Sequence, residues 1–109
     1  MLVYKRWEIW WAWFEYENHE GGKRRPVLVV SPGEAYILSA EITKHSSRNM
    51  WGEHEIIMWK SANLPIPSTV RLTRIEELKP EDFDKKIGDL HPVDIELIKE
   101  KLDITYSEE

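Results

Sequence analysis

The 109-residue sequence contains no cysteine. This absence excludes disulfide bonds, thiolate zinc sites, thiol nucleophiles and iron–sulfur clusters. The sequence also lacks an apolar run long enough for a signal peptide or a membrane span, because charged residues interrupt its tryptophan-rich start. We therefore expect a cytoplasmic protein that does not engage a membrane.

Positive charge is scarce: 15 Lys and Arg stand against 20 Asp and Glu, for a net charge of −5. A negative protein is a poor partner for nucleic acid, because phosphate contacts need Lys and Arg. The deficit is confined to one part of the chain, however. Residues 76–109 hold 12 acidic and 5 basic side chains, a balance of −7, whereas residues 1–75 have a balance of +2. The larger N-terminal part can therefore still present a basic patch.

The composition is 41% hydrophobic and 32% charged, which is typical of a folded globular protein. The length suits a single domain over residues 1–109. Short β-favouring segments separated by turns predict a small, mainly β barrel. The expected strands are Trp7–Phe14, Pro26–Ser31, Tyr36–Thr43, Glu53–Trp59, Ser68–Leu72 and Lys85–Leu90.

Side-chain alternation predicts which faces of these segments are buried. Both faces of the first strand are apolar, so both need cover; Trp7, Ile9, Trp11 and Trp13 lie on one, and Trp10, Ala12 and Phe14 on the other. The third strand is expected to point Tyr36, Leu38, Ala40 and Ile42 inward, and Ser39, Glu41 and Thr43 outward. A final helix is expected from Pro92 to about Leu102, with an apolar face of Ile95, Ile98 and Leu102 that closes one end of the barrel.

The segment Asn18–Arg25 is polar, contains two glycines, and is expected to be an exposed loop. Within it, Glu20 precedes the cations Lys23, Arg24 and Arg25. A carboxylate and guanidinium groups are suitable for RNA cleavage, in which a base removes the 2′-hydroxyl proton and cations stabilise charge on the phosphate. Composition alone, however, favours a solvated turn.

The pattern Glu20…Arg25-Pro26, followed by the apolar run 27–31, resembles the signature of MazF/PemK-type toxin endoribonucleases. The segment 5–11 is similar to the opening strand of that family, and 40–43 to its Ile-Thr strand end. The segments 67–72 and 86–90 are similar to its C-terminal half. The resemblance therefore extends along nearly the whole chain.

This resemblance implies an SH3-like barrel with a C-terminal helix, acting as the toxin of a type II toxin–antitoxin system. It implies sequence-specific, metal-independent cleavage of single-stranded RNA to 2′,3′-cyclic phosphate and 5′-hydroxyl ends, without a cofactor. By the same resemblance Glu20 is the general base, Arg25 stabilises the phosphate and donates a proton, and Thr43 is a hydroxyl partner of the phosphate. The implied partners are a cognate antitoxin and a second copy of the chain in a homodimer.

RNA contacts outside these three residues are expected from cations and one aromatic side chain. Trp51 lies in the polar segment 44–52 and is a candidate to stack on a base. The remaining expected RNA-binding residues are Lys23, Arg24, Lys44 and Arg48. The sequence departs from the family pattern at Trp7-Glu8, where Gly-Asp is usual, and also at Trp13 and Arg24.

Several alternatives remain open from the sequence. His19 and His45 could form a histidine pair that cleaves RNA, although loop histidines are usually only solvated. A metal site is less expected, because Glu53-His54-Glu55 lacks a second histidine one helical turn on, and His91 resembles a helix N-cap. In function, the rivals are a CcdB-like toxin that targets gyrase and a module that binds RNA without cutting it.

Overall fold

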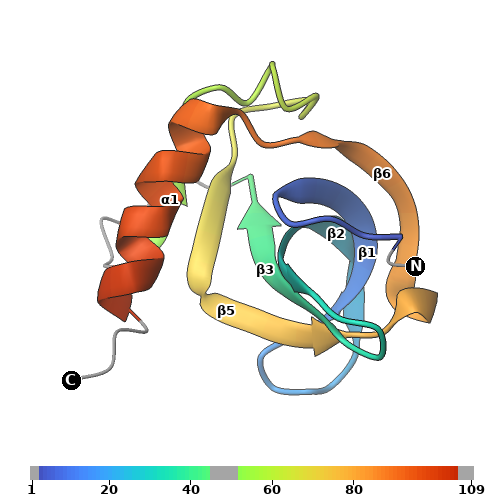
Figure 1. Ribbon diagram of the computed structural model, residues 1–109. Helices are drawn as coiled ribbons and strands as arrows, with labels where there is room; N and C mark the ends of the chain where they lie inside the picture. Colours follow the sequence, from blue (N-terminus) through green and yellow to red (C-terminus); the bar gives the residue numbers. More distant parts are fainter. Residues whose placement is uncertain (1–2, 45–51, 106–109) are drawn as a thin grey trace.

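The computed structural model describes residues 3–44 and 52–105. Six strands within these residues form one antiparallel sheet of order β4-β5-β3-β2-β1-β6, which curls into a barrel (Figure 1). The elements are β1 (Glu8–Glu15), β2 (Gly22–Pro32), β3 (Ile37–Thr43), β4 (Glu53–Glu55), β5 (Thr69–Leu78), the 3-10 helix η1 (Pro80–Asp82), β6 (Phe83–Asp89) and α1 (Pro92–Thr105). The expectation of a mainly β barrel with a C-terminal helix is confirmed.

The apolar side chains form two clusters. The larger lies between the sheet and α1, and includes Ile9, Leu28, Ile42, Leu72 and Ile98. Ile95 and Leu102 pack against it, which confirms the expected apolar face of the helix. The smaller cluster consists of Ala12, Phe14, Val27 and Leu78. Successive side chains of a strand point to opposite faces of the sheet. In β2, Leu28 therefore belongs to the larger cluster and Val27 to the smaller, and in β1 the same holds for Ile9 and Ala12.

The first hairpin differs from the expected exposed loop at 18–25. β2 begins at Gly22, which pairs with Glu15, so the cations Lys23–Arg25 lie within the strand. The turn is closed by a hydrogen bond from the Tyr16 N–H to the Gly21 carbonyl, 2.9 Å long. A Cβ on Gly22 would meet the Phe14 carbonyl at 2.5 Å, so the close strand approach requires glycine here. Backbone pairing thus extends the strand into a polar segment.

The inward and outward faces of β3 were predicted only in part. Ala40 and Ile42 are buried as expected, but Tyr36 is 50% exposed and precedes the strand. Ser39 and Glu41, expected to face solvent, are buried. The pairing of β3 with β5 shifts register between Ala40 and Glu41, and the side chains of Arg25 and Arg71 contact the Glu41 carboxylate and shield it from solvent. The first strand also differs, since Trp13 is 41% exposed and lacks the expected cover in this chain.

The strand expected over 53–59 ends at Glu55. Asp94 causes this early end, because its carboxylate accepts the N–H groups of Ile57 and Met58 at 2.8 and 2.9 Å. Those donors are thereby unavailable to a sheet partner, and the chain turns away. β5 is longer than the expected 68–72 segment because it pairs with β3 over most of its length.

Candidate active site

A hollow of about 390 Å³ lies where β2 begins and β3 ends, and the connection that precedes β5 contributes to its wall. Arg25 and Thr43, expected to act on a phosphate, both line it. Three of the expected RNA-binding cations, Lys23, Arg24 and Lys44, line it as well and are exposed. The fold thus brings together residues of β2 and β3 that the sequence separates by nearly twenty positions.

Glu20 lies outside this set. It is exposed in the β1–β2 turn, where its backbone N–H donates to Asn18 Oδ1 at 2.9 Å, and it is not among the residues that line the hollow. Gly22, the first residue of β2, and Arg25 are three residues apart, which is about 10 Å along a strand. The turn that carries Glu20 is therefore separated from Arg25 by about this length of β2. Arg48 and Trp51 fall outside the described residues, as does His45.

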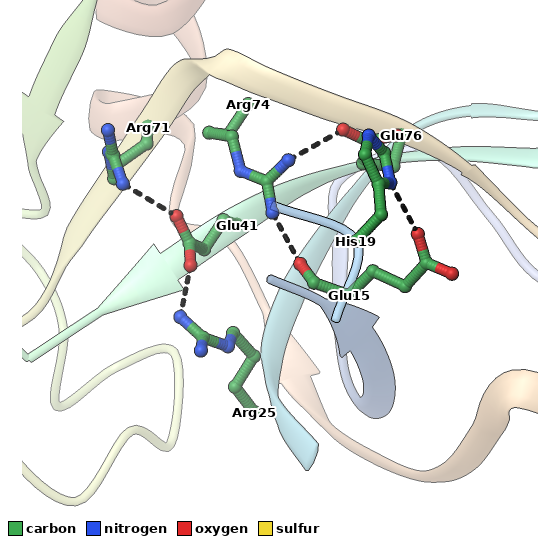
Figure 2. Close-up of polar contacts among 7 residues, drawn as sticks. All are labelled: Glu15, His19, Arg25, Glu41, Arg71, Arg74 and Glu76. Atoms are coloured by element: carbon green, nitrogen blue, oxygen red, sulfur yellow. Dashed lines mark hydrogen bonds and ion pairs between the residues drawn. The ribbon is translucent and has the colours of Figure 1, made fainter. Parts of the chain in front are cut away.

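Arg25 is held by a carboxylate that the sequence did not single out. Arg25 Nη1 donates to Glu41 Oε2, and Arg71 Nη1 donates to Glu41 Oε1 at 3.1 Å, so one carboxylate joins two guanidinium groups (Figure 2). Arg71 Nε also lies 3.5 Å from Glu53 Oε2. The charges of Arg25, Glu41, Arg71 and Glu53 therefore alternate across four neighbouring strands.

The strand register explains this alternation. Glu41 of β3 is directly opposite Arg71 of β5, which is in turn opposite Glu53 of β4. Arg25 lies two residues before Val27, the residue of β2 that pairs with Glu41. Directly opposed side chains leave the same face of a sheet at close range, so pairing alone sets these charges side by side.

This cluster is largely buried. The side chain of Glu41 is 7% exposed, and those of Arg25 and Arg71 are 15% and 20% exposed. Because the two glutamates balance the two arginines, the exposed cations Lys23, Arg24 and Lys44 provide the net positive charge of the hollow. A guanidinium has five N–H donors, so an arginine bonded to Glu41 retains others for a phosphate.

The histidines of the described chain lie away from this hollow. His19 is in the β1–β2 turn, where its Nδ1 lies 3.0 Å from Glu15 Oε1 (Figure 2). His54 is buried, with Nε2 2.7 Å from Asp94 Oδ1, and His91 caps α1 by accepting the Val93 N–H on Nδ1. Within residues 3–44 and 52–105, no three His, Asp or Glu side chains gather as a metal ion would require.

Arg25, Thr43 and the surrounding cations form a site suited to an anion. Arginine donates to two phosphate oxygens at once, and a hydroxyl can donate a further hydrogen bond. Leu64 and Ile66, which also line the hollow, supply apolar surface beside these donors. The combination fits a phosphodiester with its attached sugar and base better than a free phosphate.

Solved structures with the same fold were found among bacterial toxins and endoribonucleases. An endoribonuclease from a mycobacterial species in complex with its cognate antitoxin has a TM-score of 0.73 and 16% identity, covering 98% of each chain. The Mycobacterium tuberculosis toxin MazF-mt6 has a TM-score of 0.72 and 20% identity, covering 94% of this chain and 98% of that one. A second mycobacterial endoribonuclease has a TM-score of 0.74 and 17% identity, covering 97% and 93%.

No curated protein sequence matches the chain. The sequence model of one family, described as the PemK-like, MazF-like toxins of type II toxin–antitoxin systems, matches residues 5–106. The match spans nearly the whole chain and agrees with the fold and with the resemblance of the Arg25-Pro26 and Ile42-Thr43 segments. The chain therefore belongs to the family of PemK-like, MazF-like toxins of type II toxin–antitoxin systems.

Proposed function

We propose that this toxin is a metal-independent endoribonuclease that cleaves single-stranded RNA at specific sequences, leaving 2′,3′-cyclic phosphate and 5′-hydroxyl ends. The observation that carries the proposal is the joint placement of Arg25 and Thr43 in one cation-rich hollow. Membership of the toxin family supports it, as does the fold that the chain shares with mycobacterial endoribonucleases.

The reaction uses the RNA 2′-hydroxyl as the nucleophile. A base removes its proton, the oxygen attacks the adjacent phosphorus, and the bond to the 5′ oxygen breaks as that oxygen takes up a proton, for which the family resemblance implies Arg25 as the donor. Negative charge grows on the non-bridging phosphate oxygens in the transition state. Arg25 would donate hydrogen bonds to these oxygens and Thr43 would orient one of them. Losing one such donor typically costs about 10²–10³ in rate.

The base is proposed to be Glu20. Glu41 is the nearer carboxylate to Arg25, but each of its oxygens already accepts a guanidinium N–H. Glu20 is exposed in the turn three residues before Lys23, which lines the hollow, so RNA bound along β2 would pass close to it. Glu41 is better suited to holding Arg25 in place than to accepting a proton.

The partners and location are proposed with the activity. An endoribonuclease of the same fold has been solved in complex with its cognate antitoxin, and we propose a cognate antitoxin here. An acidic segment of the antitoxin would bind the exposed cations Lys23, Arg24 and Lys44 in the hollow of the candidate active site, where RNA is proposed to bind. The proposed working form is a homodimer in the cytoplasm, where messenger RNA is available. No helix of the described residues is long and apolar enough to span a membrane.

The test is cleavage of a long single-stranded RNA in excess EDTA, with analysis of the fragment ends. Discrete cuts with cyclic phosphate ends are expected from the native chain. Arg25→Ala should reduce the rate at least a hundred-fold. Arg6→Ala, which removes a guanidinium outside the hollow, is the matched control and should cleave normally.

Removing Arg25 also leaves Glu41 with one fewer partner, so circular dichroism must show that the variant is folded. Arg25→Lys is the second variant, because lysine keeps the charge but not the planar fork of donors. Intact RNA with the native chain would instead favour a toxin that binds gyrase or RNA without cutting it. Full activity in folded Arg25→Ala would overturn the assignment of the site.

A further inference from the structure

A large aromatic side chain on the surface lies next to the candidate active site. Trp13 of β1 is 41% exposed, and it is not among the residues that line the hollow. No aromatic ring or cation of residues 3–44 and 52–105 stacks on its indole. Single exposed apolar side chains are common on protein surfaces, so exposure alone marks no site. The position of Trp13 is what makes it informative.

The strand register places Trp13 at the rim of the hollow. Trp11 and Trp13 are two residues apart in β1, so their side chains leave the same face of the sheet about 7 Å from each other. Trp11 is directly opposite Pro26 of β2, and both line the hollow. Trp13 is directly opposite Arg24, which lines it as well. The indole of Trp13 therefore continues the wall of the hollow beyond its edge.

Uncompensated positive charge lies beside this ring. Directly opposed side chains have Cβ atoms about 5 Å apart, so Arg24 and Trp13 are neighbours on one face. Arg24 and Lys23 are exposed, and neither has a carboxylate partner among the residues that the structure describes. Arg25, in contrast, is bonded to Glu41. A ligand that fits this surface combines a flat ring with negative charge.

An RNA nucleotide meets both requirements. Unpaired bases stack on exposed aromatic side chains, and the phosphates beside them bind neighbouring cations. A second copy of the chain fits this surface less well. In a two-fold interface the same patch meets itself, so the uncompensated Arg24 and Lys23 of the two copies would face each other.

The apolar surface beside the hollow has room for one base. The next side chain on this face of β1 is Glu15, whose Oε1 lies 3.0 Å from His19 Nδ1. Glu15 is opposite Gly22, which has no side chain. The apolar part of the face therefore ends at Trp13. Stacking discriminates weakly, because every base has a flat face, so this contact adds affinity rather than sequence preference.

We propose that Trp13 and Arg24 form a platform for one unpaired RNA base next to the phosphate held in the hollow, with the base stacked on Trp13 and its own phosphate bonded to Arg24. The proposal rests on the proposed ribonuclease function and adds to it a substrate-binding residue, Trp13, outside the hollow.

The first experiment measures affinity for a fluorescently labelled 2′-O-methyl RNA, which lacks the nucleophilic hydroxyl and stays uncut. Trp13→Ala should bind about ten-fold more weakly than the native chain, since removal of a stacking ring causes a loss of that order. Trp13→Phe keeps an aromatic face and should recover most of the affinity. Tyr36→Ala, which removes an exposed ring outside the hollow, is the matched control and should bind as the native chain does.

A second experiment ties the loss to a base. Single abasic nucleotides are placed in turn along the same RNA. For the native chain, one abasic position beside the cleaved phosphate should weaken binding about ten-fold. For Trp13→Ala the same position should have little further effect, because the ring on which the base stacks is already absent. Misfolding of the variant would weaken binding at every position alike and would not produce this coupling.

The outcomes separate the two proposals. Native affinity in Trp13→Ala, or independent effects of the ring and the abasic position, overturns the platform and leaves the ribonuclease intact. A native chain that shows the coupling but leaves unmodified RNA uncut overturns the ribonuclease and supports the platform. Light scattering that shows a native dimer and a Trp13→Ala monomer assigns Trp13 to a subunit interface and overturns the platform. A native chain that does not bind RNA overturns both.

Discussion

At the scale of single residues, the candidate site depends on Glu41, which sets the geometry of both Arg25 and Arg71 (Figure 2). A carboxylate that is 7% exposed loses most of its hydration, and the hydrogen bonds from the two guanidinium groups compensate for that loss. Arginine side chains are otherwise flexible and costly to order. Because Glu41 already holds the arginines in place, less side-chain conformational entropy is lost when RNA binds.

Glu41→Gln should therefore destabilise the fold. The substitution removes a buried negative charge between two positive ones and replaces one acceptor oxygen by a donor group, which faces a guanidinium. Because the arginines are partly exposed, we expect the free energy of unfolding to fall by about 1–3 kcal/mol. Urea unfolding of the native and variant chains measures the change. Glu77→Gln, in an exposed position of β5, should change it by less than about 0.5 kcal/mol.

A Glu41→Gln variant as stable as the native chain would show that the two arginines are held by other contacts.

The importance of Glu41 and Arg71 could not be predicted from the sequence. Arg25 and Thr43 lie in motifs that resemble a known family, whereas Glu41 occupies an apparently solvated position of an alternating strand. Its burial follows from strand register, which places it between side chains 16 and 30 residues away in sequence. Local pattern carries no information on such pairings.

At the scale of elements, α1 is anchored to the sheet by a buried polar contact as well as by its apolar face. Asp94 in the first turn of the helix is fully buried and bonds His54 of β4 together with the N–H groups of Ile57 and Met58. At the other end of the helix, Lys101 Nζ donates to the Glu53 carbonyl at 2.7 Å. The helix thereby holds β4, the strand that carries Glu53 and Glu55, at the edge of the sheet.

The position of the helix was predictable from Pro92 and the spacing of Ile95, Ile98 and Leu102. The end of β4 was not, because an aspartate forty residues further along the chain decides it. Apolar residues follow Glu55 without a local turn signal, so the sequence pattern alone predicts a strand that continues to Trp59. Strand ends set by a distant side chain are a general limit on prediction from sequence.

The contact between His54 and Asp94 predicts how stability depends on pH. Burial lowers the pKa of His54 below its usual 6.5, and this outweighs the opposing effect of the Asp94 carboxylate. As pH falls below about 6.5, the unfolded chain therefore binds a proton that the folded chain does not. The free energy of unfolding should fall by up to about 1.4 kcal/mol per pH unit from this histidine until the folded pKa is reached.

Urea unfolding at several pH values between 5 and 7.5 tests this, with His54→Gln as the comparison. Glutamine can donate to Asp94 but does not titrate, so the slope should be smaller in the variant. Equal slopes in the native chain and in His54→Gln would mean that His54 does not contribute.

At the scale of the whole molecule, the protein combines a net charge of −5 with a basic hollow. The acidic excess lies in residues 76–109, which include the end of β5, β6 and α1. The hollow is instead built from the start of β2, the end of β3 and the start of β5, where Lys23, Arg24 and Lys44 are exposed. Segregation of charge in the sequence thus becomes segregation in space, and RNA bound at the proposed site would be attracted by a local field rather than by the net charge.

This arrangement predicts a modest salt dependence of RNA binding. Three exposed cations per chain, with Arg25 and Arg71 already paired to carboxylates, give a slope of log K against log salt of about −2 for single-stranded RNA. Binding is measured with 2′-O-methyl RNA, which lacks the nucleophilic hydroxyl and stays uncut. Lys23→Gln should make the slope shallower by about 0.7, the value of one phosphate contact. Lys99→Gln on the exposed side of α1 should leave it unchanged. A slope near zero, or an equal effect of the two substitutions, would place RNA away from this hollow.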